Sequence, residues 1–161
     1  MRRPVFLLLS LALAVPAAAQ QRSLGIFGLW GVFAEKSRCF IISEPLRPRR
    51  ADSGRAFASV GWFPAQGVRG QLHIRFAEAK RQGSAVLLRI DDRTFQLAGG
   101  GADAWAPDGR ADAEIVAAMR SGLDMSVETR NVRGGLMRDA YQLRGAATAL
   151  DAAAIACAPK R

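Results

Sequence analysis

The chain has 161 residues and carries 23 Lys and Arg against 14 Asp and Glu, which gives a formal net charge of +9 at pH 7. Its single histidine and two widely separated cysteines exclude a Cys-x-x-Cys redox site and a zinc site built from cysteine and histidine. We therefore expect no metal and no cofactor, and a length of this kind fits one domain.

Residues 1–19 have the features of a secretory signal peptide. Arg2 and Arg3 precede an apolar run from Val5 to Val15, and three alanines then offer a cleavage site. The run is too short to span a hydrocarbon core and no second run follows, so we expect no transmembrane segment in the mature chain. We expect residues 20–161 to form a single domain that is periplasmic or secreted.

Two apolar segments at the start of this domain predict a hairpin. Phe27–Ala34 and Arg38–Ser43 flank a short polar stretch, and because both are apolar on two faces we expect them near the centre of the fold. Cys39 lies in the second segment, and Cys157 lies close to the other end of the chain. In an oxidising compartment a lone pair of cysteines is most simply a disulfide, so we predict a bond between Cys39 and Cys157.

A basic, proline-containing segment follows this hairpin. Arg47, Arg49 and Arg50, together with Arg55, form the densest cluster of positive charge in the chain. Such a cluster can attract anionic lipid headgroups or acidic polysaccharide. Aromatic residues do not alternate with these arginines, so we do not expect nucleic acid as a partner. We expect the loop to contact a macromolecular partner.

The rest of the chain is dominated by the period of two residues that is typical of β-strands. The predicted strands in this part are 57–63, 72–76, 84–90, 93–97, 123–127 and 137–144. The pair Asp91-Asp92 separates two of them and predicts a second hairpin. His73 falls on the polar side of its strand, where we expect it to face solvent.

Residues 98–112 are polar and rich in glycine, which predicts a long loop. Trp105 stands in this loop, whereas Trp30 and Trp62 lie in apolar strands and are expected in the core. Exposed tryptophan is a frequent anchor at interfaces. Trp105 is therefore the first candidate for contact with a partner.

Two short helices interrupt the strands. Asp112 is expected to cap the first, which ends near Gly122. Thr148 and Asp151 have the spacing of a capping box for the second, which would press Cys157 against the core. Strands and helices together predict a mainly β fold: an antiparallel β-sandwich or small barrel of about eight strands with two short helices.

Four features occur in a fixed order along the chain: Phe27-Gly28-Leu29-Trp30, then Cys39, then the strand from Val86 to Asp91, and finally the run from Tyr141 to Leu150. In this order the chain resembles the invasion-associated locus B family of exported alphaproteobacterial proteins. The resemblance implies a periplasmic or secreted, mainly β protein, linked in some pathogens to entry into host cells. It implies no catalytic residues.

The sequence shows no pairing of a nucleophile with a base, so we expect no catalytic residue. We expect a non-enzymatic protein that binds a macromolecule of the cell envelope or of a host surface through its loops. One alternative is a hydrolase of envelope polymers that uses carboxylates brought together by folding, for example Asp91, Asp92, Asp103 or Asp108. Another is an inhibitor of an envelope-attacking hydrolase.

Overall fold

The computed structural model describes residues 21–48 and 54–159. The predicted signal peptide, residues 1–19, lies outside the described residues, as do Arg49 and Arg50. In chain order the elements are β1 (Arg22–Phe27), β2 (Trp30–Ala34), β3 (Cys39–Ser43), β4 (Phe57–Phe63), the 3-10 helix η1 (Pro64–Gln66), β5 (Val68–Arg75), β6 (Val86–Ile90), β7 (Arg93–Gly100), β8 (Asp103–Trp105), α1 (Gly109–Ser121), β9 (Asp124–Arg130), β10 (Leu136–Gln142) and α2 (Ala146–Ala156).

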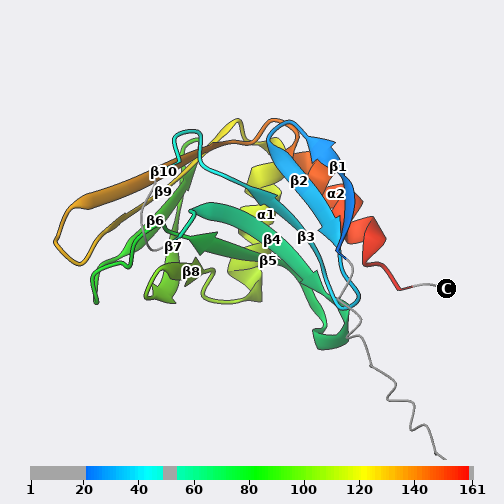
Figure 1. Ribbon diagram of the computed structural model, residues 1–161, viewed down its shortest axis with the longest axis horizontal. Coiled ribbons are helices and arrows are strands. Elements are labelled where there is room, and N and C mark those ends of the chain that lie inside the picture. Colours follow the sequence, from blue (N-terminus) through cyan, green and yellow to red (C-terminus); the bar gives the residue numbers. More distant parts are fainter. Residues whose placement is uncertain (1–20, 49–53, 160–161) are drawn as a thin grey trace, which may run out of the picture.

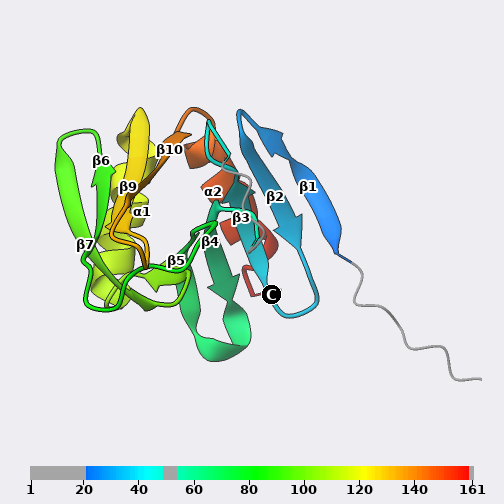
Figure 2. The ribbon, with the colours of Figure 1, turned by 60° about the vertical axis from the view of Figure 1, so that its left-hand side comes forward.

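The ten described strands form one antiparallel sheet in the order β1-β2-β3-β4-β5-β8-β7-β6-β9-β10. The sheet bends, so that β6, β7 and β9 lie on one side of the molecule and β1–β3 on the other (Figure 2). It is not closed into a barrel. The prediction of a mainly β antiparallel fold with two helices is confirmed, with two strands more than expected.

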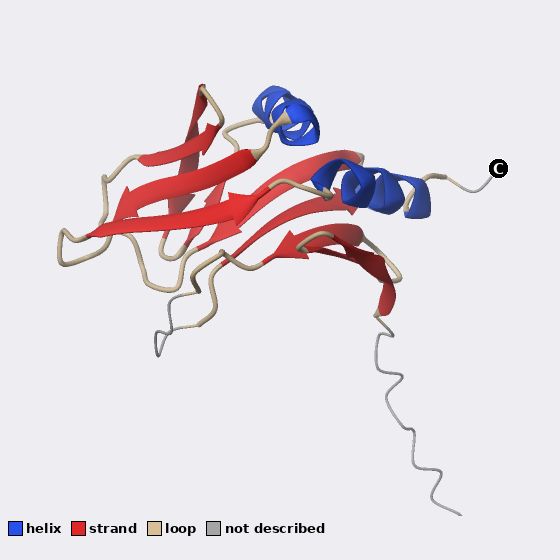
Figure 3. Cartoon of the chain, turned by 90° about the horizontal axis from the view of Figure 1, so that it is seen from above, coloured by secondary structure: helices blue, strands red, loops and turns tan. Residues whose placement is uncertain are grey.

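Both helices pack on the same face of the sheet, behind β2–β5 in Figure 1. Figure 3 shows them next to each other, and α1 contacts β5 while α2 contacts β2 and β3. Ile115 and Met119 of α1 and Leu150 of α2 are buried against the sheet, as expected of an apolar helical stripe. Trp30 and Trp62 belong to the same core, as predicted.

The two ends of the sheet meet beside α2. The Trp30 indole Nε1 of β2 donates to the carbonyl of Gln142 at 2.9 Å, and the amide of Leu46 donates to the carbonyl of Ala140 at 2.8 Å. The turn after β1 also packs closely against the chain that precedes α2, because a Cβ on Gly28 would collide with the carbonyl of Arg144. These contacts hold the two ends of the bent sheet close to each other, although no pairing of the described strands joins them.

The predicted disulfide is present. Cys39 in β3 is joined to Cys157 at the end of α2, with an S–S distance of 2.07 Å and the two Cα atoms 5.8 Å apart. Cys39 is almost completely buried. The bond therefore fixes the end of the last helix to the central part of the sheet.

Several predicted boundaries were wrong. Phe27–Ala34 is not one strand, because Gly28 turns the chain at a φ of +62° between β1 and β2. The residue that caps α1 is Asp108, whose carboxylate accepts from the amide of Ala111 at 2.8 Å. The predicted loop 98–112 contains the end of β7 and all of β8.

The capping box predicted for the last helix is also wrong. The helix α2 begins at Ala146, two residues before Thr148, and its N-cap is Gly145 in a left-handed conformation with no side-chain hydrogen bond. Within the part of the chain that the structure describes, neither helix is long and apolar enough to cross a membrane.

Candidate functional site

Side chains of β2–β5 alternate between two faces that differ in their surroundings. On the inner face, Val32, Ile41 and Leu72 are completely buried beneath the helices. Neither described helix covers the outer face, as is common for an antiparallel sheet. It carries aromatic side chains where polar ones would be usual. We call this set the aromatic face: Phe33, Phe40, Phe57, Phe63, His73 and Trp105.

The strand register sorts these rings into neighbouring pairs. Phe33 lies opposite Phe40, and the two rings stack with centroids 5.5 Å apart. His73 lies opposite Trp105, and these rings are nearly parallel, with centroids 5.1 Å apart. Five of the six rings are half-buried, and Trp105 is 38% exposed. The sheet thus presents ring surfaces on both sides of β4, the third of the five adjacent strands β2-β3-β4-β5-β8.

Small residues open a groove between the two pairs of rings. On this face the middle of β4 carries Ser59 and Gly61. A Cβ on Gly61 would lie 2.9 Å from Cε2 of Phe63, and a Cβ on Gly31 would lie 3.0 Å from Cε2 of Phe33, so each ring leans back over a glycine two residues earlier. The resulting groove has a volume of about 590 Å³ and is open to solvent.

One end of the groove is a polar cluster around Asp103. This carboxylate accepts from His73 Nε2 at 2.8 Å and from Arg75 Nη1 at 2.7 Å. The ring of Phe57 meets His73 edge-on, with centroids 5.2 Å apart. Partial burial acts to raise the pKa of Asp103, but the hydrogen bonds from His73 and Arg75 outweigh it and the pKa lies below its ordinary value. Asp103 thereby holds the His73 ring flat beneath Trp105.

The other end of the groove has a second ion pair. Arg38 donates to both carboxylate oxygens of Glu35, at 2.8 and 3.2 Å, and lies over the ring of Phe40 at 5.0 Å from its centroid. The hydrogen bond from Arg38 lowers the pKa of Glu35. Each of the two guanidinium groups, Arg38 and Arg75, is thus matched by a carboxylate of this protein, and neither offers an uncompensated charge.

Polar atoms without a partner lie between the two ion pairs. The hydroxyl of Ser59 and the side-chain amide of Gln71 make no side-chain hydrogen bond within the described residues. His73 uses Nε2 for Asp103, which leaves Nδ1 as its remaining polar atom. Because Ser59 and His73 are directly opposite on adjacent strands, these groups form a short polar strip in the middle of the aromatic lining.

The structure places the predicted partner contacts in different locations. Trp105 lies in β8 at the edge of the aromatic face, not in a loop. Arg47 is exposed after β3 and is not among the residues that line the groove. Arg49 and Arg50 lie outside the described residues. The expectation that His73 simply faces solvent was wrong, because Asp103 and two aromatic rings contact it.

The carboxylates weighed for a hydrolase are not brought together as an acid and base pair. Asp91 accepts from the amides of Leu123 and Asp124, both at 3.1 Å, and Asp108 caps α1. Asp103 is held by its ion pair. Asp92 is exposed in the turn between β6 and β7. Asp91, Asp103 and Asp108 therefore each bind another group of this protein.

Ser59, His73 and Asp103 lie side by side, which raises the question of a catalytic triad. In such a triad the serine hydroxyl donates to the histidine, and donors for an oxyanion lie close by. No hydrogen bond joins Ser59 to His73 in the described structure, and Phe57 packs edge-on against the imidazole. The three side chains are therefore adjacent without the serine–histidine hydrogen bond of such a triad.

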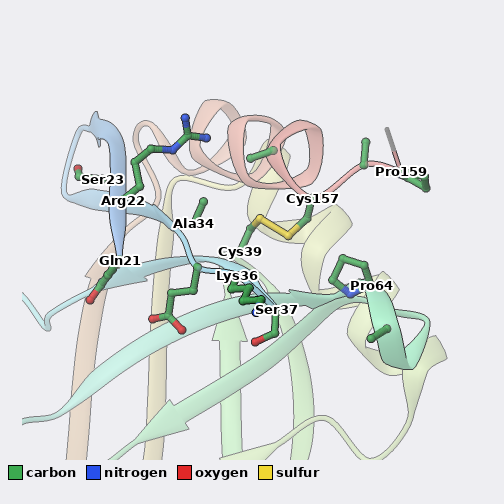
Figure 4. A pocket seen from close by; sticks show the side chains of 14 residues that line it. Gln21, Arg22, Ser23, Ala34, Lys36, Ser37, Cys39, Pro64, Cys157 and Pro159 are labelled. Atoms are coloured by element: carbon green, nitrogen blue, oxygen red, sulfur yellow. A yellow bond between two sulfur atoms is a disulfide. The ribbon is translucent and has the colours of Figure 1, made fainter. Parts of the chain in front are cut away.

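A second hollow, of about 960 Å³, lies beside the disulfide (Figure 4). Cys39 and Cys157 form one wall, and Pro64 and Pro159 lie nearby in the same view. Its lining has no aromatic side chain, and its one carboxylate, Glu35, already pairs with Arg38. Its other polar lining residues are Gln21, Arg22, Ser23, Lys36 and Ser37, so it differs from the aromatic face in offering polar groups without stacked rings.

Comparisons of this chain with protein-family models, with curated proteins and with solved structures found no match. The described residues contain no group of three or more His, Cys, Asp or Glu side chains that could hold a metal ion. The assignment of a function therefore rests on the chemistry of the groove itself.

Proposed function

We propose that this protein is an exported, non-enzymatic binding module of the invasion-associated locus B type, which captures a macromolecule of the cell envelope or of a host surface on its aromatic face. The observation that carries the proposal is the outer face of β2–β5, where six rings line an open groove on the side of the sheet opposite the two described helices. Disulfide bonding between Cys39 and Cys157 is compatible with export into an oxidising compartment.

The energetics favour recognition at this surface. Aromatic side chains lose little rotational freedom when they bind, and they carry much of the free energy at protein interfaces. The strands hold these rings in fixed register, so a partner meets a preorganised surface. The proposed contact surface is a sheet face, whereas the sequence predicted contact through loops. Trp105 belongs to both the predicted and the proposed contact.

Affinity capture from an envelope extract tests the proposal. The wild-type protein is compared with the double variant Phe40→Ala, Trp105→Ala, with Arg47→Ala for the basic loop, and with Val132→Ala as a control, because Val132 is 64% exposed in a distant turn. We expect the double variant alone to lose the captured material while its circular dichroism spectrum is unchanged.

Two results would contradict the proposal. Equal capture by the double variant would place the binding surface elsewhere, and loss of capture with Arg47→Ala alone would return it to the basic loop. Turnover of an envelope polymer that disappears in Asp103→Asn would favour the hydrolase alternative, because that variant keeps the size of the side chain but removes its charge.

A further inference from the structure

The composition of the groove restricts the chemistry of what it binds. Six of its twelve lining residues are aromatic or imidazole rings, and Ile42 is the one branched aliphatic side chain among them. A site for an acyl chain is usually enclosed and lined by aliphatic groups. This groove is open along its length and aromatic, which suits a ligand that presents flat surfaces of weakly polar C–H groups to the negative faces of rings.

The ion pairs at the two ends of the groove favour a neutral ligand over an anionic one. Arg38 is neutralised by Glu35 and Arg75 by Asp103. An anionic polymer would have to compete with these carboxylates and would meet their repulsion. A neutral ligand meets neither cost. In the middle of the groove, the groups left to bind it are the hydroxyl of Ser59, the amide of Gln71 and Nδ1 of His73, and Gln21 adds a further amide to the lining.

These three groups share one property, since each can form a hydrogen bond with a hydroxyl group. Ser59 offers a donor and an acceptor, Gln71 offers both through its amide, and Nδ1 of His73 is the polar atom that remains once Nε2 donates to Asp103. Hydroxyl groups are donors and acceptors at the same atom, so they can satisfy each of the three.

We propose that the groove binds a neutral polysaccharide, whose sugar rings stack on Trp105, Phe33 and Phe40 while its hydroxyl groups bond to Ser59, Gln71 and His73. A pyranose ring combines a patch of C–H groups on each face with hydroxyls around its rim, which matches aromatic walls that flank a polar strip. An open groove across several strands admits a chain of sugars rather than one small molecule. This inference rests on the proposed function and names the class of macromolecule.

Isothermal titration calorimetry with defined sugars tests it. The probes are the linear hexamers of glucose and of N-acetylglucosamine as neutral chains, with polygalacturonate as an anionic chain. We expect a neutral hexamer to bind with an affinity that salt does not change, since screening acts on charges. Trp105→Ala should weaken binding by about tenfold and Gln71→Ala by about fivefold, as expected for the loss of an aromatic anchor and of one polar contact.

The control variant Val132→Ala should bind as the wild type does, and all variants should keep the circular dichroism spectrum of the folded wild type. Failure of both neutral hexamers to bind at millimolar concentration overturns the polysaccharide, and so does binding of polygalacturonate alone with strong salt dependence. If a protein is instead captured from the envelope extract and lost in the aromatic double variant, the polysaccharide is wrong while the binding module stands. If capture does not depend on the aromatic face at all, both proposals fail.

Discussion

Among single residues, Asp112 has the most unusual surroundings. Its side chain comes from α1, is only 9% exposed, and accepts from the backbone amide of Leu72 at 2.7 Å. Leu72 pairs with Val60 of β4 on one side, but β8 ends opposite His73, so on the other side β5 has no strand partner at Leu72 and the carboxylate takes that place. Burial raises the pKa of Asp112, and the hydrogen bond from Leu72 offsets part of this effect.

The substitution Asp112→Ala removes the acceptor and should lower the free energy of unfolding by about 1 to 3 kcal/mol, because it leaves a buried amide without a partner. Asp112→Asn keeps an acceptor oxygen and removes the buried charge, so its stability should lie close to that of the wild type. Urea unfolding at pH 7 measures both. Equal losses in the two variants would show that the hydrogen bond to Leu72 does not matter.

The lowered pKa of Asp103 should make the stability of the protein depend on pH. Its pKa is lower in the folded protein than in the unfolded chain, because His73 and Arg75 bind the charged form. Folding is therefore favoured by this residue above the unfolded-state pKa, and that stability is lost as the pH falls through the folded-state pKa. In calorimetric scans across the acid range, the thermal midpoint of Asp103→Asn should fall less with decreasing pH than that of the wild type. Parallel midpoint curves would contradict the argument.

At the scale of elements, α2 is attached to the sheet by a covalent bond in addition to its packing. It begins without a side-chain cap, and its last residue is followed directly by Cys157. The disulfide joins residues 118 positions apart in the chain. The double variant Cys39→Ser, Cys157→Ser should lower the free energy of unfolding by about 2 to 4 kcal/mol while the helical circular dichroism signal persists at low temperature. Chemical unfolding of both proteins measures this, and an unchanged midpoint would contradict it.

The elements also show what sequence periodicity can and cannot predict. Alternation located most of the strands, because the burial of neighbouring residues is a local property. The same reasoning placed 27–34 and 38–43 at the centre because both faces are apolar, whereas the second face is the aromatic groove. Only the register across five strands brings Phe33, Phe40 and Trp105 together. Phe33 and Phe63 share a local signal, a glycine two residues earlier at Gly31 and Gly61, but Phe40 and Trp105 lack it.

For the whole molecule, the bend of the sheet depends on two glycines at the meeting point of its ends. Gly145 has a φ of +92°, and a Cβ there would collide with the carbonyl of Phe27. Gly28 lies across the same contact at a φ of +62°. Backbone on both sides leaves little room for adjustment, since neither partner is a flexible side chain. The contact thus joins the first hairpin to the chain that leads into α2.

The substitution Gly145→Ala should lower the free energy of unfolding by at least about 2 kcal/mol, from the strain of a positive φ and from overpacking. Gly100→Ala is the matched control, because a Cβ at Gly100 meets no atom within 4 Å, and it should change stability by less than about 1 kcal/mol. Denaturant unfolding followed by both tryptophan fluorescence and circular dichroism measures the two variants. Because the contact closes the fold, both signals should shift together in Gly145→Ala. A shift in fluorescence alone would mean that the first hairpin opens locally and that the bend of the sheet survives without this contact.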